Sequence, residues 1–226
     1  MANSPAFYGI CLFFVLFCSI SLFYLNSFFT LNMASFRPYF SAFPIVFILV
    51  IPIITMKSWA EERKLGSIEL LLTMPFSEWE LVLGKFFAAF GAVIVLLVLS
   101  LPVPLSLLPL GRFDMGVLFG EYTGALLLGA SATSLGLLLS SLSKNQAGAF
   151  LGSAVVLLFT MLINQLTMAF SLPPVIAGGL NYLSLSFHFE SFTKGIIDTK
   201  DLAFFLLSTV MFLFLNTRVI IYRKWS

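Results

Sequence analysis

The chain has 226 residues, of which 60% are hydrophobic and 10% are charged, and its mean hydropathy is +1.05. A soluble domain carries roughly 25% charged residues, so the composition excludes a soluble fold, and a net charge of +2 is too small to indicate nucleic acid as a partner. In lipid only helices and closed barrels satisfy the backbone, and barrel strands alternate polar and apolar residues. The long continuous apolar runs therefore predict an all-α membrane protein.

Six apolar runs approach or exceed the length of about 20 residues that a membrane-spanning helix needs. We expect spans at about 7–25, 39–56, 86–108, 118–139, 147–170 and 202–221, all within one transmembrane domain that covers residues 1–226. Pro44 and Pro52 are expected to kink the second span. Pro102, Pro104 and Pro109 are expected to break the far end of the third span.

Six spans place both chain ends on one side of the membrane, and the basic residues predict which side. The terminal side holds Lys57, Arg63, Lys64, Lys85, Lys144, Arg218, Arg223 and Lys224, and the other side holds Arg37, Arg112, Lys194 and Lys200. Cytoplasmic loops carry an excess of Lys and Arg, so we expect both termini to be cytoplasmic. Residues 57–85 then form a cytoplasmic loop, and residues 171–201 form an extracytoplasmic segment.

The loop at 57–85 begins with a charged cluster just after the second span. The cluster consists of Glu61, Glu62, Arg63 and Lys64. Gly66 is a predicted helix stop, because glycine accepts the left-handed conformation at a C-cap. The sequence thus predicts that one helix ends at the membrane surface and that a new one follows.

The rest of this loop predicts two further helix starts. Ser67 can cap a short helix over 68–73, with Glu69 in its first turn, where the helix dipole favours an anion. Ser77 and Glu80 have the spacing of a capping box ahead of a helix that enters the membrane. The short helix, fixed by breaks at both ends, can act as a lever between a soluble partner and two spans. Alternatively, it is an interfacial helix that only anchors the loop among lipid headgroups.

The run from Ala60 to Phe86 resembles the loop between spans two and three of ABC-2 transporter permeases. The matching elements are Glu61-Glu62-Arg63, Gly66-Ser67-Ile68-Glu69-Leu70-Leu71-Leu72, Pro75-Phe76-Ser77, Glu80 and Gly84-Lys85. In that family the loop is a coupling helix that contacts the ATPase subunit. The resemblance implies an ATPase-coupling interface that includes Glu61, Glu62, Arg63, Gly66, Ser67, Glu69, Leu70, Thr73 and Pro75.

The resemblance extends beyond the loop. Residues 3–8 resemble the entry to the first span, and residues 143–146 resemble the short turn after span four. Residues 188–198 resemble the segment before the last span in the gliding-motility (GldF-type) branch. The family usually has a basic elbow helix before span one, whereas Met1 lies almost at the membrane here, so we expect that element to be missing or truncated.

The resemblance implies a permease subunit of an ATP-driven transporter in the bacterial cytoplasmic (inner) membrane. Its partners would be a separate ABC ATPase subunit, a second permease copy or a related permease, and membrane lipid. The chain lacks a Gly-x-x-x-x-Gly-Lys-Ser/Thr loop, so we expect no cofactor on this chain and ATP on the partner. The alternative is an ATPase-independent membrane protein, such as a secondary transporter or an intramembrane enzyme, which generally places ionisable groups at mid-membrane.

Few polar residues lie within the expected spans. Asn164 and Gln165 in span five either line a translocation path or hydrogen-bond between helices, and we favour packing. Glu121 is expected near the membrane interface, where a charge costs less than at the centre, which favours a structural or headgroup role over a proton relay. His188 is the single histidine and is expected to be structural. A small-residue face of span four, which includes Gly124, Gly129 and Gly136, is expected to support close helix packing.

Overall fold

A computed structural model describes residues 5–25, 35–67, 75–111, 113–170 and 173–224. Over these residues the secondary structure is helical and contains no strand, which confirms the predicted all-α class. Six stretches are long and apolar enough to cross a membrane: Phe7–Tyr24, Arg37–Lys64, Glu78–Leu110, Met115–Leu142, Gln146–Thr167 and Thr199–Arg223. Each stretch overlaps one of the ranges expected from the sequence.

The first two spans are each built from more than one helical piece. Helix α1 (Pro5–Ile20) continues into a π-helical turn, η1 (Ser21–Leu25). The second span consists of α2 (Arg37–Phe40), α3 (Phe43–Thr55) and the short α4 (Ala60–Lys64). Pro52 lies inside α3, but Pro44 lies in its first turn. Because the first turn has no intrahelical N–H bonds to lose, Pro44 begins α3 and does not interrupt it. The second span is interrupted just before Pro44, between α2 and α3.

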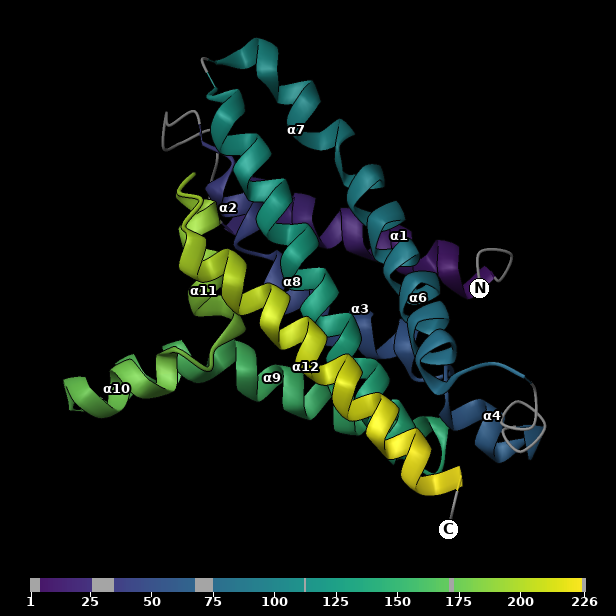
Figure 1. Ribbon diagram of the computed structural model, residues 1–226. Helices are drawn as coiled ribbons and strands as arrows, with labels where there is room; N and C mark the ends of the chain where they lie inside the picture. The colour runs from purple at the N-terminus through teal and green to yellow at the C-terminus, as the bar shows by residue number, and fades with distance from the viewer. Residues whose placement is uncertain (1–4, 26–34, 68–74, 112, 171–172, 225–226) are drawn as a thin grey trace.

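The third span is broken at its prolines, as predicted. Helix α6 (Glu78–Ser100) is followed by α7 (Pro102–Leu107) and by a 3-10 turn, η2 (Leu108–Leu110). Proline has no backbone N–H and cannot donate within a helix interior, so each piece restarts at or next to a proline. Figure 1 shows α7 extending beyond the end of α6 toward the start of α8.

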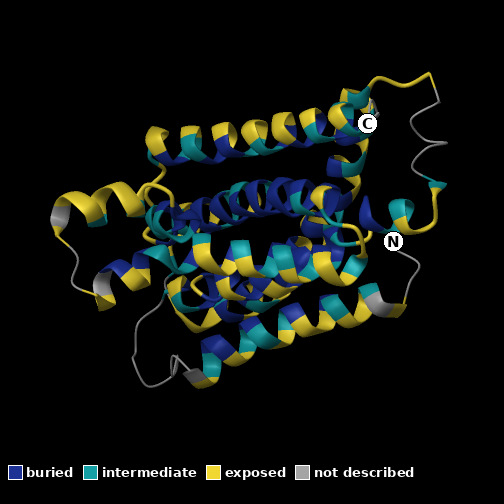
Figure 2. Ribbon diagram, turned by 90° about the horizontal axis from the view of Figure 1, so that it is seen from below, coloured by how far each residue is buried: buried dark blue, intermediate teal, exposed yellow. Residues whose placement is uncertain are grey.

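Helix α8 (Met115–Leu142) is the centre of the fold, and most of its residues are buried. It packs against α3, α6, α9 (Gln146–Ala169), α11 (Leu185–Thr193) and α12 (Thr199–Lys224). The short α10 (Pro174–Asn181) connects α9 to the α11 region. In Figure 2 the buried residues gather on the inner helices, and the exposed residues lie on outward faces.

Three glycines of α8 allow this close packing. A methyl group at Gly124 would lie 2.5 Å from the Cβ of Phe192 on α11, and one at Gly129 would lie 2.7 Å from Val93 on α6. A methyl group at Gly136 would lie 2.5 Å from the hydroxyl of Thr55 on α3. The predicted small-residue face therefore serves contacts within this chain, and each of the three glycines admits a different helix.

The two ends of the bundle carry different elements. The start of α1, the end of α12 and helix α4 lie at one end, which we call the α4 end (Figures 1 and 2). Helices α2, α7, α10 and α11 lie toward the opposite end, which we call the α11 end. The described parts of the loop, residues 57–67 and 75–85, thus lie at the same end of the bundle as the start of α1 and the end of α12, as an even number of spans requires.

Candidate functional site

The α4 end contains a dense polar cluster that begins where α3 turns into α4. The hydroxyl of Ser140, near the end of α8, accepts hydrogen bonds from the backbone N–H groups of Trp59 (3.2 Å) and Ala60 (3.4 Å). The same hydroxyl lies 3.3 Å from the carbonyl oxygen of Met56. The first N–H groups of a helix lack intrahelical partners, and the N-cap of α4 has no side-chain bond of its own. Ser140 therefore caps α4 from a neighbouring helix.

Arg63 joins the opposite face of this turn to the end of α8. Its guanidinium donates to the carbonyl oxygens of Ser141 and Ser143, each at 2.5 Å. Arg223, from α12, donates to the carbonyl oxygen of Leu142 at 3.0 Å. The last carbonyl groups of a helix are otherwise unpaired and carry partial negative charge. Two arginines from two other helices therefore close the end of α8.

Lys85 connects the same turn to α6. Its Nζ lies 2.5 Å from Oε1 of Glu62, 2.6 Å from the carbonyl oxygen of Ser58 and 4.5 Å from the centre of the Trp59 ring. Lys85 and Glu62 are mostly buried, which makes their pairing stronger than that of a surface pair. We refer to Ser58, Trp59, Glu62, Arg63, Lys85 and Ser140 as the anchor cluster. The anchor cluster binds the ends of α3 and α4 to α6 and α8.

The helix signals of the loop are confirmed where the structure describes them. Gly66 has a φ of +71° just after the C-cap of α4, which is the left-handed conformation predicted for a helix stop. Ser77 and Glu80 form the predicted capping box at the start of α6: the backbone N–H of Ser77 donates to the Glu80 carboxylate at 2.8 Å, and that of Glu80 donates to the Ser77 hydroxyl at 3.3 Å. Ser67 donates from its hydroxyl to the carbonyl of Glu62 at 3.2 Å.

The predicted coupling residues are only partly within the described chain. Glu61, Glu62 and Arg63 lie on α4, and Pro75 is exposed just before α6. Glu69, Leu70 and Thr73, together with the short helix expected over 68–73, lie outside the described residues. The charged residues are neighbours along the chain, and the structure shows that two of them, Glu62 and Arg63, bond to neighbouring helices.

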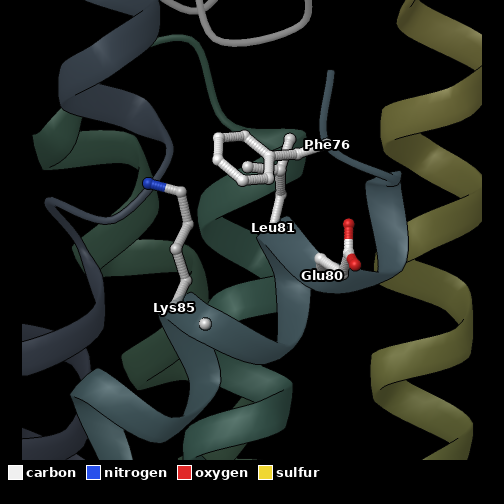
Figure 3. Close-up of a pocket in the computed structure, with 5 residues that line it drawn as sticks. Phe76, Glu80, Leu81 and Lys85 are labelled. Carbon is white, nitrogen blue, oxygen red and sulfur yellow. The ribbon is translucent and has the colours of Figure 1, made fainter. Parts of the chain in front are cut away.

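A cavity of about 530 Å³ opens beside the first turns of α6. It is lined by Phe76, Glu80, Leu81, Gly84 and Lys85. In Figure 3 the Phe76 ring lies over Leu81, while Lys85 and Glu80 point to either side. Phe76 and Leu65, which follows α4, are exposed at 54% and 73% of their surfaces. The loop thus presents apolar side chains between charged ones.

Polar residues within the spans do not form one site. Asn164 is buried, and its backbone carbonyl accepts a hydrogen bond from the Thr167 hydroxyl, which also lies 2.8 Å from Oδ1 of Asn181. Gln165, its neighbour in sequence, is exposed. Glu121 is fully buried inside the bundle. The expectation of a headgroup role for Glu121 is therefore wrong, because its side chain faces the protein core and not the lipid surface.

At the α11 end, His188 holds α11 against α12. Its Nδ1 lies 2.6 Å from the Asp201 carboxylate, its Nε2 lies 3.2 Å from the Tyr182 carbonyl oxygen, and its ring stacks on Phe204 at 3.8 Å. Asp198 precedes α12 and accepts a hydrogen bond from the backbone N–H of Lys200, and this bond and the Lys200 side chain hold the pKa of Asp198 below its ordinary value. The sequence did not indicate the role of Asp201, because it lies thirteen residues from His188.

The fold and the six candidate spans define a multi-pass helical membrane protein. Residues 26–199 match the family model described as ABC-2 family transporter protein. Because this match covers more than half of the chain, the chain belongs to the ABC-2 transporter family.

Two curated relatives share part of the sequence. Over 151 residues the chain is 30% identical to the probable multidrug ABC transporter permease YbhR of Escherichia coli strain K12, which covers 64% of this chain and 39% of that protein. The same values hold for the protein of that name in Escherichia coli O157:H7. The match therefore spans well under half the length of these relatives.

Proposed function

We propose that this chain is the permease subunit of an ABC-2-type transporter, in which a separate ATPase subunit binds ATP and docks on the loop at 57–85. The observation that carries this proposal is the anchor cluster, which ties the loop to the membrane helices. A second copy or a related permease completes the pore. The complex lies in the bacterial cytoplasmic (inner) membrane with the α4 end in the cytoplasm.

In this proposal the anchor cluster transmits motion. A partner that pulls on the loop moves α4, and α4 is bonded to α8 through Arg63 and to α6 through Glu62. Arg223 connects α12 to the end of α8 through its bond to the Leu142 carbonyl oxygen. Because packed helices move as rigid bodies, displacement of one short helix becomes displacement of several spans. Exposed Leu65 and Phe76 supply apolar contact area for docking.

The test separates docking from transmission in the full chain, purified with the subunits that accompany it. Leu65→Asp combined with Phe76→Asp, or Glu69→Arg combined with Leu71→Asp, is expected to abolish co-purification of an ATPase. Arg63→Gln is expected to preserve co-purification and to abolish ATP-dependent activity. Lys57→Gln removes an exposed positive charge of the same loop and serves as the matched control.

Two outcomes count against the proposal. An ATPase that co-purifies equally with both docking variants does not bind this loop. ATP-dependent activity that survives Arg63→Gln at the level of Lys57→Gln shows that the anchor cluster does not transmit motion. The interfacial-anchor alternative for the loop predicts the first outcome, because charged substitutions would then weaken only the contact with headgroups.

A role in gliding motility is a finer proposal that rests on the resemblance of residues 188–198 to the gliding-motility branch. Deletion of this gene in a gliding host is expected to stop surface movement, and re-expression of the chain is expected to restore it. Normal movement of the deletion strain would remove this role and leave the permease proposal intact.

The alternative of an ATPase-independent transporter is favoured by one observation, the buried carboxyl group of Glu121. Secondary transporters use such intramembrane groups for coupling ions. Uptake or export in vesicles distinguishes the two functions. A transporter driven by an ATPase needs ATP and tolerates collapse of the ion gradients, whereas a secondary transporter shows the reverse dependence.

A further inference from the structure

Glu121 lies in the core of the bundle without a hydrogen-bond partner. Its exposed surface is 0%, and neither carboxyl oxygen has a donor among the residues that the structure describes. The helical spacing places Glu121 on the same face of α8 as the buried Leu118, Ala125 and Leu128. An unpaired carboxyl group in such surroundings costs free energy. Ionisable residues inside a membrane span are by default candidates for functional groups.

The other described acidic residues in polar networks have partners. Glu62 meets Lys85, Asp201 meets His188, and Glu190 meets both Arg37 (3.3 Å) and Lys194 (2.9 Å). Among the described acidic residues that are buried, Glu121 alone has neither oxygen bonded. The structure therefore neutralises its other buried acid and leaves this one available.

Arg37, on α2, pairs with Glu190 and not with Glu121. The guanidinium of Arg37 donates to Glu190 at the surface, at 3.3 Å, and it makes no ion pair with Glu121 within 4.0 Å. Glu121 thus has no direct counter-ion among the described residues. A ligand that carries a positive charge would complete this site.

The surroundings favour an organic cation over a metal ion. Metal ions of the calcium and magnesium type take six or more oxygen ligands, and no group of three metal-ligating side chains occurs in the described part of the chain. Next to Glu121 on α8, Tyr122 packs edge-on against Phe40, with ring centres 4.9 Å apart, and Phe40 meets Tyr39 at 5.4 Å. Aromatic faces attract weakly hydrated organic cations.

Helix α11 covers this level of α8. Phe192 on α11 packs against Gly124, and Gly195, which follows α11, packs against Gly120. A methyl group at Gly120 would lie 3.8 Å from the Cα of Gly195, and one at Gly124 would overlap the Cβ of Phe192 at 2.5 Å. Movement of α11 away from these glycines would open the level at which Glu121 lies. The glycines allow a close but largely apolar contact, which can separate without breaking charged bonds to α8.

We infer that Glu121 is the binding group for a lipophilic organic cation, of the quaternary ammonium or phosphonium class, that enters when α11 moves off α8. The inference rests on the proposed function, since it names the substrate class of that transporter. The carboxylate supplies the counter-charge, and the apolar and aromatic side chains supply the surface for the ligand body.

The experiment measures binding of two probes of similar shape to the full chain, purified with its accompanying subunits in nanodiscs without ATP. Methyltriphenylphosphonium carries a positive charge, and triphenylphosphine oxide is neutral. Glu121→Gln is expected to weaken binding of the cation about tenfold or more, because a buried counter-charge is lost. Glu121→Asp retains the carboxylate and is expected to retain binding of the cation. Binding of the neutral probe is expected to be the same in all variants.

Asp114→Asn is the matched control. Asp114 is an exposed acid at the start of the same helix, where its carboxylate accepts a bond from the N–H of Gly116 at 2.8 Å, and asparagine preserves that cap. It is expected to bind the cation within about threefold of the wild type, as surface substitutions do. Arg37→Gln removes a competing positive charge and is expected to strengthen cation binding.

Three results would overturn the inference: equal binding of both probes, undetectable binding of the cation by the wild type, or unchanged cation binding by Glu121→Gln. The thermal unfolding midpoint of each variant shows that loss of binding is not loss of fold. If an ATPase co-purifies and ATP-dependent activity persists while the inference fails, the proposed function stands. If Glu121-dependent binding is found but no ATPase accompanies the chain, the inference stands and the proposed function fails.

Discussion

Glu62 and Glu121 are both acids in helices of the same bundle, and their surroundings differ completely. Glu62 lies at the α4 end with Lys85 beside it and Arg63 next in sequence. Glu121 lies among apolar side chains with neither oxygen bonded. The first arrangement suits a rigid connection between helices, because every hydrogen bond and ion pair of the anchor cluster raises the free energy needed to separate them. The second arrangement suits a ligand-binding group, because the carboxyl group of Glu121 has no partner in the protein.

The largest expected effect comes from removing the hydrogen bonds that Arg63 makes in the anchor cluster. Arg63→Ala breaks two bonds from a charged donor and leaves the carbonyls of Ser141 and Ser143 without it. At about 1.5 kcal/mol for each such bond, the free energy of unfolding falls by about 3 kcal/mol. Denaturant unfolding in detergent micelles measures this loss. Arg63→Lys keeps the charge but cannot reach two carbonyls in a fork, so it should recover less than half of the loss.

If Arg63→Ala is as stable as the wild type, the contrast between a bonded Glu62 region and an unbonded Glu121 does not hold. It would mean that the polar links at the α4 end hold no more than ordinary surface pairs do, which contribute about 0 to 1 kcal/mol. The anchor cluster would then lose its place in the proposed transmission of motion.

Replacing the unpaired acid is expected to act in the opposite direction. Glu121→Met removes a buried carboxyl group without partners and keeps a side chain of similar length, so unfolding should cost about 2 kcal/mol more than in the wild type. The same variant should lose cation binding. The measurement is the unfolding midpoint in the same micelles used for Arg63→Ala. A destabilised Glu121→Met would show that the carboxyl group has a structural partner, and the contrast with Glu62 would disappear.

The glycine contact between α8 and α11 predicts a further difference. A methyl group at Gly124 meets the Cβ of Phe192 at 2.5 Å, whereas one at Gly152 on α9 meets nothing within 4 Å. Gly124→Ala should therefore destabilise the protein by about 1.5 kcal/mol through overpacking, and thermal unfolding measures the shift. Gly152→Ala is the matched control and should be neutral or slightly stabilising, because alanine favours the helix. Equal effects of the two changes would contradict close packing of α11 on α8.

Much of the fold was predictable because lipid imposes long apolar helices, and a run of apolar residues reports them directly. The breaks at Pro102 and Pro109, the helix stop at Gly66 and the capping box at Ser77 were also predictable, since each depends on residues close in sequence. Pro44 shows the limit of such rules. Its effect depends on where the helix begins, and the sequence does not mark that boundary in a continuous apolar run.

Contacts between distant residues were not predictable. Ser140 caps a helix that lies some eighty positions earlier, and a serine near the end of an apolar helix carries no signal of that role. The burial of Glu121 was not predictable for a related reason: sequence position indicates depth along the helix, but the direction of the side chain depends on which helices pack against α8. The charged loop was visible in the sequence, whereas its attachment to α6 and α8 was not.

The smallest expected effect tests whether the anchor cluster depends on the capping box at the start of α6 or on the bonds that Lys85 makes to α4. Ser77→Ala removes the hydroxyl that accepts the N–H of Glu80, which costs about 1 kcal/mol at an N-cap. Lys85 lies about two turns further along α6 and is held by Glu62 and the Ser58 carbonyl, so fraying at Ser77 should not release it. We expect ATP-dependent activity to stay unchanged while the unfolding midpoint falls slightly, and Glu80→Gln to lower it less, because glutamine preserves the capping box. A loss of activity in Ser77→Ala would show that transmission of motion depends on the capped start of α6 and not on the Lys85–Glu62 pair.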